Sequence, residues 1–412
     1  MKKTLAAVAV LGAFAGSALA ADVQLYGIVD TGVGYNHVDV DSLDGINIPN
    51  KAGDATAYSF ADSDSFSMMS GQASGSRWGL KGTEDLGNGL TVGFILEDGF
   101  TSDNGADSAP MFNRESSLFV QGGFGKFAMG RMGSLNNGQS SWAKVGMVSA
   151  FGTSGWGGYS AQLSNIFSLA GQWDNMVAYE TPSFAGFKVY AQYAMGSNDN
   201  ENESSSDRYY AIGATYNNGP FAGYFAVDSI NYQTSGAKID DKYIDDSLTV
   251  TLGGSWNFEV AKVYFGAQYF DEVKLSSIGG ITKTTVSDVN LSKISDLPDI
   301  TVGALVKVKG YGISLTADAP VAGGKAMFGV GYVDAEAADS IQDALKDANA
   351  DADLDLKRYV VSVGYDYPFS KRTDVYAIAS YMQDQVDTKL SGTSYDWDPS
   401  AYTLYVGLRH RF

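Results

Sequence analysis

The chain ends in the sequence AYTLYVGLRHRF (residues 401–412), and this segment decides the fold. Apolar and polar side chains alternate along it. One parity carries Tyr402, Leu404, Val406, Leu408 and Phe412, and the other carries Thr403, Tyr405, Gly407, Arg409 and Arg411. Successive side chains of a β-strand point to opposite faces of its sheet. The segment therefore predicts a strand with an apolar medium on one face and water on the other.

The same alternation returns in residues 90–97, 186–193 and 261–269. The connections between such segments come in two lengths. The short ones are Leu86–Gly89, Asn217–Gly219 and Pro368–Arg372, and the long polar ones are 37–74, 101–112, 196–207, 233–246, 273–299 and 335–356. Short turns at one end and long loops at the other are typical of bacterial outer-membrane β-barrels. Polar loops of this length also argue against a compact soluble domain.

The strand-like segments number about sixteen, an even number of the kind that closed bacterial barrels use. They begin near residues 22, 76, 89, 113, 126, 174, 186, 207, 220, 246, 260, 309, 324, 357, 373 and 401. Residues 300–308 are also strand-like and belong either to a neighbouring strand or to a loop. Barrels of about 16 to 18 strands enclose an aqueous channel. The predicted fold is all-β, a transmembrane antiparallel β-barrel that forms one domain over residues 21–412.

The first 20 residues are predicted to be a secretory signal peptide, with Lys2 and Lys3 at its start, an apolar run from Leu5 to Leu11, and a small-residue cleavage site before Ala21. Its removal takes two lysines from the formal charge of −19, which leaves −21. A charge of this sign excludes nucleic acid as a partner. No later stretch reaches the roughly 18 apolar residues that a membrane-spanning helix requires. A mature chain that lives in a membrane must therefore be a barrel.

Several short blocks resemble one known family when they are read in order along the chain. They are Val23–Gly27, Ser76–Gly82 with Glu84–Gly87, Gly130-Arg131, Asp174-Asn175 with Tyr179, Pro182–Phe187, Ser370–Thr373 and Gly407–Phe412. Each block is weak alone, but together they span nearly the whole mature chain. They resemble the Gram-negative general-diffusion porins, in particular the branch common in β-proteobacteria.

The resemblance implies a sixteen-stranded homotrimer in the outer membrane, in contact with its lipid and lipopolysaccharide, through which small hydrophilic solutes and ions diffuse passively. It implies that the third external loop, here Ser134–Gln172, folds inward and narrows the pore. It also implies that the terminal Phe412 is part of the signal read by the barrel-assembly machinery. An ordinary aromatic side chain at the membrane interface is the simpler reading of Phe412.

In the family, basic side chains on the barrel wall face acidic groups on the inward loop. The matching wall positions are Arg77 and Arg114, with Arg131 at the end of the strand that leads into the loop. Arg77 and Lys81 share the parity expected to face the lumen. Arg131 instead shares the parity of Phe127 and Met129, which makes its direction ambiguous. A ring of charges is one of a few ways to build a filter.

The chain departs from the family in the loop, which carries one charge, Lys144, and no acid. We expect Glu97 and Glu180 on the wall to supply the acidic side of the field instead. The loop is rich in large apolar side chains, namely Trp142, Met147, Phe151, Trp156, Tyr159 and Phe167. The favoured reading is that they pin the loop to the wall by burying apolar area. The alternative is a stacking surface for sugar rings or other flat solutes.

Catalytic chemistry has little support in the sequence. The two histidines are His37, near the first loop, and His410, on the predicted outward parity of the last strand. No catalytic, cofactor or metal site is expected, and the acidic run from Asp347 to Asp355 lacks the spacing of a calcium-binding loop. The alternatives to general diffusion are a substrate-selective, sugar-type porin and a structural or adhesive barrel. The acidic external loops predict mild cation selectivity.

Overall fold

The computed structural model describes residues 23–40, 46–49, 55–58, 62–107, 110–153, 156–196, 206–232, 238–239, 242–243, 245–275, 307–347, 352–390 and 393–412. The predicted signal peptide and its cleavage site lie outside these residues. So do residues 300–306 of the extra strand-like segment, whereas Lys307 and Val308 form the start of a strand.

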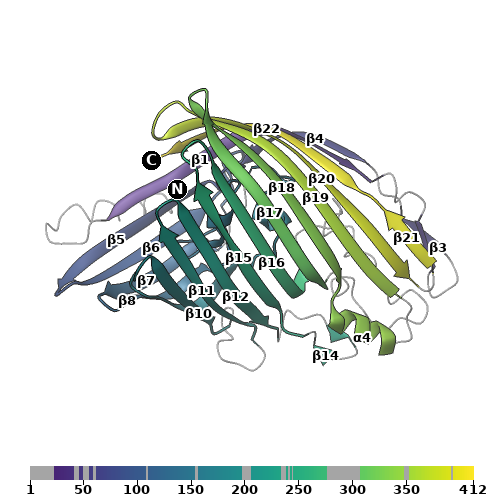
Figure 1. Ribbon diagram of the computed structural model, residues 1–412, viewed down its shortest axis with the longest axis horizontal. Helices are drawn as coiled ribbons and strands as arrows, with labels where there is room; N and C mark the ends of the chain where they lie inside the picture. Colours follow the sequence, from purple (N-terminus) through teal and green to yellow (C-terminus); the bar gives the residue numbers. More distant parts are fainter. Residues whose placement is uncertain are drawn as a thin grey trace.

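The molecule is a closed antiparallel barrel of 16 strands, as predicted (Figure 1). Its strands are β1 (Gln24–Asp39), β5 (Arg77–Gly87), β6 (Leu90–Gly99), β7 (Glu115–Gly122), β8 (Gly125–Gly133), β9 (Gln172–Glu180), β10 (Phe187–Ala194), β11 (Arg208–Asn218), β12 (Phe221–Asn231), β15 (Leu248–Asn257), β16 (Lys262–Lys274), β17 (Lys307–Val321), β18 (Gly324–Ala337), β19 (Ala352–Pro368), β20 (Thr373–Leu390) and β22 (Ser400–Arg411). Each strand pairs with the next along the chain, so almost every hydrogen-bonded neighbour is also a sequence neighbour.

Shorter elements lie in the long connections between these strands. They are β2 (Ile46–Pro49), β3 (Ala55–Tyr58), β4 (Ser63–Ser70), β13 (Lys238–Ile239), β14 (Lys242–Tyr243), β21 (Thr393–Trp397), and the helices η2 (Val145–Val148), η3 (Leu163–Asn165) and α4 (Asp339–Asp347). The predicted loop 37–74 is shorter in the structure, because Ser63–Ser70 form β4 and pair with Thr31–Val38 of β1. Only Phe66 and Met68 mark the apolar outer face of β4 among polar neighbours, so the alternation in the sequence was too short to indicate a strand. None of the helices in the described residues is long and apolar enough to cross a membrane.

The barrel closes where its first and last strands pair. Residues Ile28–Asp39 of β1 pair with Ser400–Arg411 of β22. The amide of Gly27 donates to the carbonyl of Phe412 and the amide of Phe412 donates to the carbonyl of Gly27, both at 3.1 Å. The first and last strands therefore lie side by side (Figure 1), and the peptide group before Phe412 completes the ladder.

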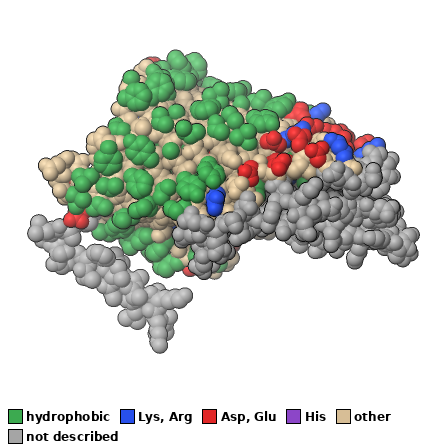
Figure 2. Space-filling model, turned by 90° about the horizontal axis from the view of Figure 1, so that it is seen from below, with side chains coloured by type: hydrophobic (Ala, Val, Ile, Leu, Met, Phe, Trp, Pro, Cys, Tyr) green, Lys and Arg blue, Asp and Glu red, His purple; other side chains and the backbone are tan. Residues whose placement is uncertain are grey.

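The alternation in the sequence matches the two faces of the wall. Leu404, Val406 and Leu408 are each about half exposed on the outer face, whereas Arg409 is 6% exposed on the inner face. Equivalent outward positions on other strands carry Val33, Ile212, Leu252, Phe265, Leu315, Phe328 and Val363. Figure 2 shows the result as an outer face covered by apolar side chains, with charged side chains gathered toward one end. The predicted parity is confirmed.

The seam gives a first prediction. A β-carbon added at Gly27 would lie 2.3 Å from Cζ of Phe412 and 2.7 Å from the main-chain oxygen of Arg77. Gly27→Val is therefore expected to push the last strand away from the first and to lower the free energy of unfolding by about 1–3 kcal/mol. Urea unfolding of the refolded barrel in detergent, followed by tryptophan fluorescence, measures this change.

Gly123→Val is the matched control, because an added β-carbon at Gly123 meets nothing within 4 Å. Equal unfolding midpoints for the two variants would show that the seam is not the sensitive point.

Candidate channel constriction

The loop between β8 and β9, residues 134–171, runs inside the barrel along its wall. Its backbone amides donate to inward side chains of three strands: Ala150 to Thr316 of β17 at 2.8 Å, Ala161 to Ser362 of β19 at 2.8 Å, and Ser168 to Gln268 of β16 at 2.6 Å. These bonds replace the water that would otherwise solvate the loop backbone. The inward fold of the third loop is therefore confirmed.

Large apolar side chains hold the loop against the wall. Trp142, Phe151 and Phe167 are each 1% exposed, and Trp156 is 6% exposed. Burying a side chain of this size contributes on the order of 2–3 kcal/mol. These four rings have no open face for a solute, so they pin the loop as the favoured reading predicted. Met147 and Tyr159 differ, because both remain half-buried.

Glycines on the inner wall make room for the loop. A β-carbon at Gly312 of β17 would lie 2.1 Å from the main-chain oxygen of Ile166, and one at Gly331 of β18 would lie 2.3 Å from Cδ1 of the same residue. Gly253 and Gly266, on β15 and β16, face Val148 in the same way. A row of inward glycines on neighbouring strands was the sequence signal for this contact, and sequence reasoning missed it.

A fully buried ion pair on the inner wall also holds the loop in place. Arg358 on β19 donates from Nε and Nη2 to the two carboxylate oxygens of Asp384 on β20, at 2.7 and 2.8 Å, and both side chains are 0% exposed. Its Nη1 donates to the main-chain oxygen of Asn165 in the loop at 3.1 Å. The fork of one guanidinium thus joins two strands to the loop. Neither residue stood out in the sequence.

The loop also contacts β10 and β12 through Leu135 and Asn136, and it meets the part of the wall near β5–β7 at two places. At its beginning, Ser141 donates from its amide and hydroxyl to Glu115 of β7, at 2.7 and 2.9 Å, and Arg114 donates to Gln139 at 2.8 Å. At its tip, the amide of Trp156 donates to the carbonyl of Gln72, in the segment between β4 and β5. We infer that the open passage lies between these two contacts, with β5, β6 and β7 on one side and the loop on the other.

Three of the predicted wall residues meet beside this passage. Glu97 of β6 accepts from Arg114 Nε at 2.6 Å, lies 3.4 Å from Arg77 Nε, and accepts from the Tyr26 hydroxyl at 3.0 Å. Both arginines thus share one carboxylate, and the group carries a net positive charge. Lys81, on the same face of β5, is exposed and lies 5.1 Å from the centre of the Tyr26 ring.

The second predicted acid, Glu180 of β9, lies among lysines. It forms an ion pair with Lys188 of β10, and it is the cross-strand neighbour of Lys126 on β8. The loop residue Lys144 donates to the carbonyl of Ser141 at 2.8 Å. Burial, together with repulsion from Lys126 and Lys188, lowers the pKa of Lys144 to about 8. Glu97 and Glu180 are therefore both paired with basic side chains. They do not form the acidic side of the field that we expected from the sequence.

Arg131 does not join either group. It follows the outward row of Phe127 and Met129, both exposed, and the ladder shifts by one residue at this point of β8. Its guanidinium forms an ion pair with Asp174 at 2.5 Å and donates to the carbonyl of Asn113 at 2.7 Å. Arg131 thus lies on the outward side of β8, as its shared parity with Phe127 and Met129 suggested, and it is directed away from the passage.

The remaining residues discussed in the sequence lie away from the constriction. His37 contacts Asp64 at 2.9 Å near the long-loop end, and His410 lies on the outer face, 2.9 Å from the Thr373 hydroxyl. Helix α4 ends at Asp347, where the acidic run noted in the sequence begins. The acidic run that includes Asp347 and Asp355 is only partly within the described residues, and no group of three potential metal ligands is found in the parts that are.

Comparison with known proteins agrees with this architecture. The family model of the Gram-negative porins matches residues 6–387. An outer membrane porin protein of Bordetella pertussis is 32% identical over the full length of both chains. Outer membrane porin protein 32 of Delftia acidovorans is 28% identical, also over both full lengths. The chain belongs to the Gram-negative porins.

A solved structure extends the likeness to three dimensions. The anion-selective porin from Comamonas acidovorans superposes on this porin with a TM-score of 0.64 and 25% sequence identity, and the match covers 95% of this chain and 100% of that one. The porin is thus an outer-membrane β-barrel that forms a channel for passive diffusion. Members of this family are channels rather than enzymes.

The contact between loop and wall gives the second prediction. In Gly312→Ala the new methyl group meets the main chain of Ile166, which cannot rotate away. We expect the loop to shift toward the pore axis, with lower single-channel conductance, more current noise, and a loss of about 1–3 kcal/mol of stability. Planar-bilayer recordings measure the first two effects.

Gly146→Ala is the control within the loop itself, because an added β-carbon there meets nothing within 4 Å. A Gly312→Ala channel with the conductance and noise of the parent would contradict the close contact.

Proposed function

We propose that this porin is a general-diffusion channel that sorts solutes by size and charge rather than by shape. The observation that carries the proposal is the burial of Trp142, Phe151, Trp156 and Phe167 against the wall. Recognition of a sugar ring requires an accessible aromatic face or a set of converging polar groups. Here the rings are used to hold the loop, and the open passage is bounded by charged side chains instead.

Liposome swelling tests this proposal. With sugars of graded size, the rate is expected to fall smoothly with molecular mass and to be the same for stereoisomers of equal mass. A marked preference for one stereoisomer would favour the substrate-selective porin. No swelling with any sugar would favour the structural or adhesive barrel.

We infer that the constriction itself favours anions. The two charged groups described above, with Lys81 and Glu115 beside them, contain Arg77, Lys81, Arg114, Lys126, Lys144 and Lys188, set against Glu97, Glu115 and Glu180. Glu84, Asp85, Asp98 and the Arg131–Asp174 pair, on the same strands, are outside these groups. Six cations minus three acids leaves an excess of three positive charges. The relative from Comamonas acidovorans is named anion-selective. The acidic external loops support the opposite expectation from the sequence, but charges farther than about 8 Å from an ion are largely screened at physiological salt.

A reversal potential in a KCl gradient decides between these two expectations. If the charges at the constriction dominate, chloride permeates more readily than potassium, and raising the pH above 8 reduces this preference as Lys144 loses its proton. A preference for potassium at neutral pH would show that the acidic loops dominate instead.

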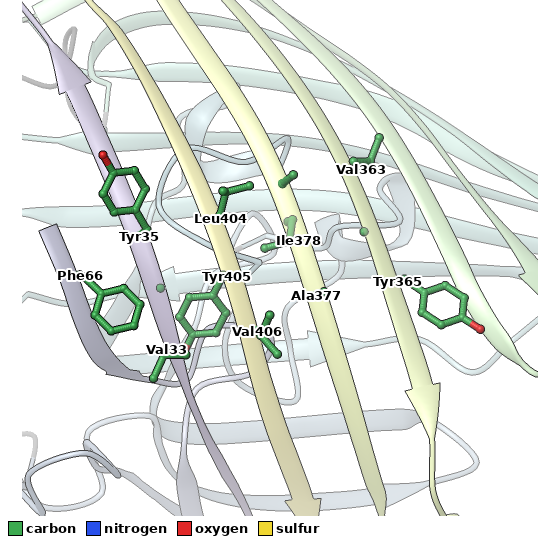
Figure 3. A pocket seen from close by; sticks show the side chains of 13 residues that line it. Val33, Tyr35, Phe66, Val363, Tyr365, Ala377, Ile378, Leu404, Tyr405 and Val406 are labelled. Carbon is green, nitrogen blue, oxygen red and sulfur yellow. The ribbon is translucent and has the colours of Figure 1, made fainter. Parts of the chain in front are cut away.

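We also propose a homotrimer, on the strength of the family resemblance and of an apolar groove on the outer face. The groove has a volume of about 570 Å³ and crosses β1, β22, β20 and β19, where Ala377 and Ala379 lie among larger neighbours such as Val33, Leu404 and Val406 (Figure 3). Small residues let a neighbouring subunit approach closely within a membrane. Three equal closing steps per insertion in the bilayer recordings would support the trimer, and single steps would count against it.

Three further proposals concern export and surroundings. We propose cleavage after residue 20, which N-terminal sequencing of the mature protein checks.

We propose that Phe412 belongs to the assembly signal, which predicts less folded barrel in the outer membrane for Phe412→Ala. We propose contacts between the acidic external loops and lipopolysaccharide, which predict a lower thermal stability after chelation of divalent cations.

A further inference from the structure

Three lysines from three different parts of the chain surround one acid inside the barrel. Lys126 comes from β8, Lys188 from β10 and Lys144 from the inward loop, and Glu180 of β9 lies among them. We call Lys126, Lys144 and Lys188 with Glu180 the lysine cluster. Glu115 lies nearby and also favours the charged forms of Lys126 and Lys144, while its two oxygens accept from Ser141 and Ser117. Three cations minus these two acids leave one positive charge.

The ammonium group of Lys126 is positioned by two aromatic rings. It lies 4.3 Å from the centre of the Phe119 ring and 5.0 Å from that of Trp142. It has no hydrogen bond and no ion pair with any of the residues that the structure describes. A lysine ammonium carries three donors, so Lys126 is oriented by two aromatic rings and keeps its donors for another ligand.

Lys144 is placed in a similar way. Its ammonium lies 5.4 Å from the centre of the Tyr190 ring and uses one donor, toward the carbonyl of Ser141. Its charge is opposed by Lys126 and Lys188 and favoured by Glu180 and Glu115. Bringing several like charges together in a partly buried site is costly unless an opposite charge is close. A bound anion would supply the missing charge.

We propose that the lysine cluster is a binding site for a small divalent oxyanion, of the size and charge of sulfate or hydrogen phosphate, within the channel. Lys126 and Lys144 donate to the anion, and Lys188 adds its charge while it remains paired with Glu180. The ligand joins the loop to the wall, since Lys144 belongs to the loop and Lys126 to β8. The proposal rests on the channel function above and adds the solute class that the channel concentrates.

Sulfate is the probe, because its charge does not change over the pH range of interest. In planar-bilayer recordings with KCl on both sides, we expect millimolar sulfate to reduce the chloride current in a saturable manner. Lys126→Met and Lys144→Met each remove one donor and one charge, so we expect the sulfate concentration for half-reduction to rise about tenfold. Lys144→Arg keeps the charge and is expected to bind sulfate at least as well above pH 8, where the parent weakens.

The matched control is Lys262→Met. Lys262 also faces the lumen, and its ammonium lies 4.7 Å from the centre of the Tyr264 ring. It lies on β16, which pairs with β15, so no lysine of the cluster is on the strand beside it there. Unchanged block in Lys262→Met supports a defined site. An equal loss of block in Lys262→Met and Lys126→Met, or a current reduction that never saturates, overturns the proposal in favour of a diffuse field. A parent chain that conducts no ions would instead overturn the channel function itself.

Discussion

Within hydrocarbon, every backbone amide and carbonyl must find its partner inside the protein, because an unsatisfied group there costs several kcal/mol. For a strand structure this requirement allows one solution, a sheet without edges. The pairing of Ile28–Asp39 with Ser400–Arg411, continued by the reciprocal bonds of Gly27 and Phe412, provides that closure. The rest of the architecture depends on this seam, which joins residues from opposite ends of the chain.

Closure creates an interior, and the interior determines what the third loop can do. A loop that enters the lumen must exchange hydrogen bonds with water for bonds with the wall, as Ala150, Ala161 and Ser168 do. It must also fit against a surface of inward side chains, and the glycines of β15–β18 make the required space. The channel is therefore narrowed by a packed interface, in which aromatic rings of the loop lie against glycines of the wall.

Charge near the passage is arranged locally, and the net charge of the chain says little about it. Arg77 and Arg114 share Glu97, and Glu180 pairs with Lys188 beside Lys126, so these two groups contain more basic than acidic side chains although the chain as a whole is strongly acidic. Many of the acidic residues lie in the long connections between strands. The net charge of the whole sequence combines these two regions, whereas an ion at the constriction is affected mainly by the charges close to it.

The sequence by itself determined the strands, their order and the two faces of the wall, because a side chain that meets lipid on one face and water on the other must alternate with a period of two. It also placed Arg77, Arg114 and Glu97 on the inner face, and it identified the loop that turns inward. Only the tertiary structure decided that Arg131 pairs with Asp174, that Arg358 and Asp384 support Asn165, and that Lys144 joins Lys126 and Lys188. These contacts link strands and loop segments that are distant along the chain, so the closure of the barrel, rather than any local pattern, brings them together.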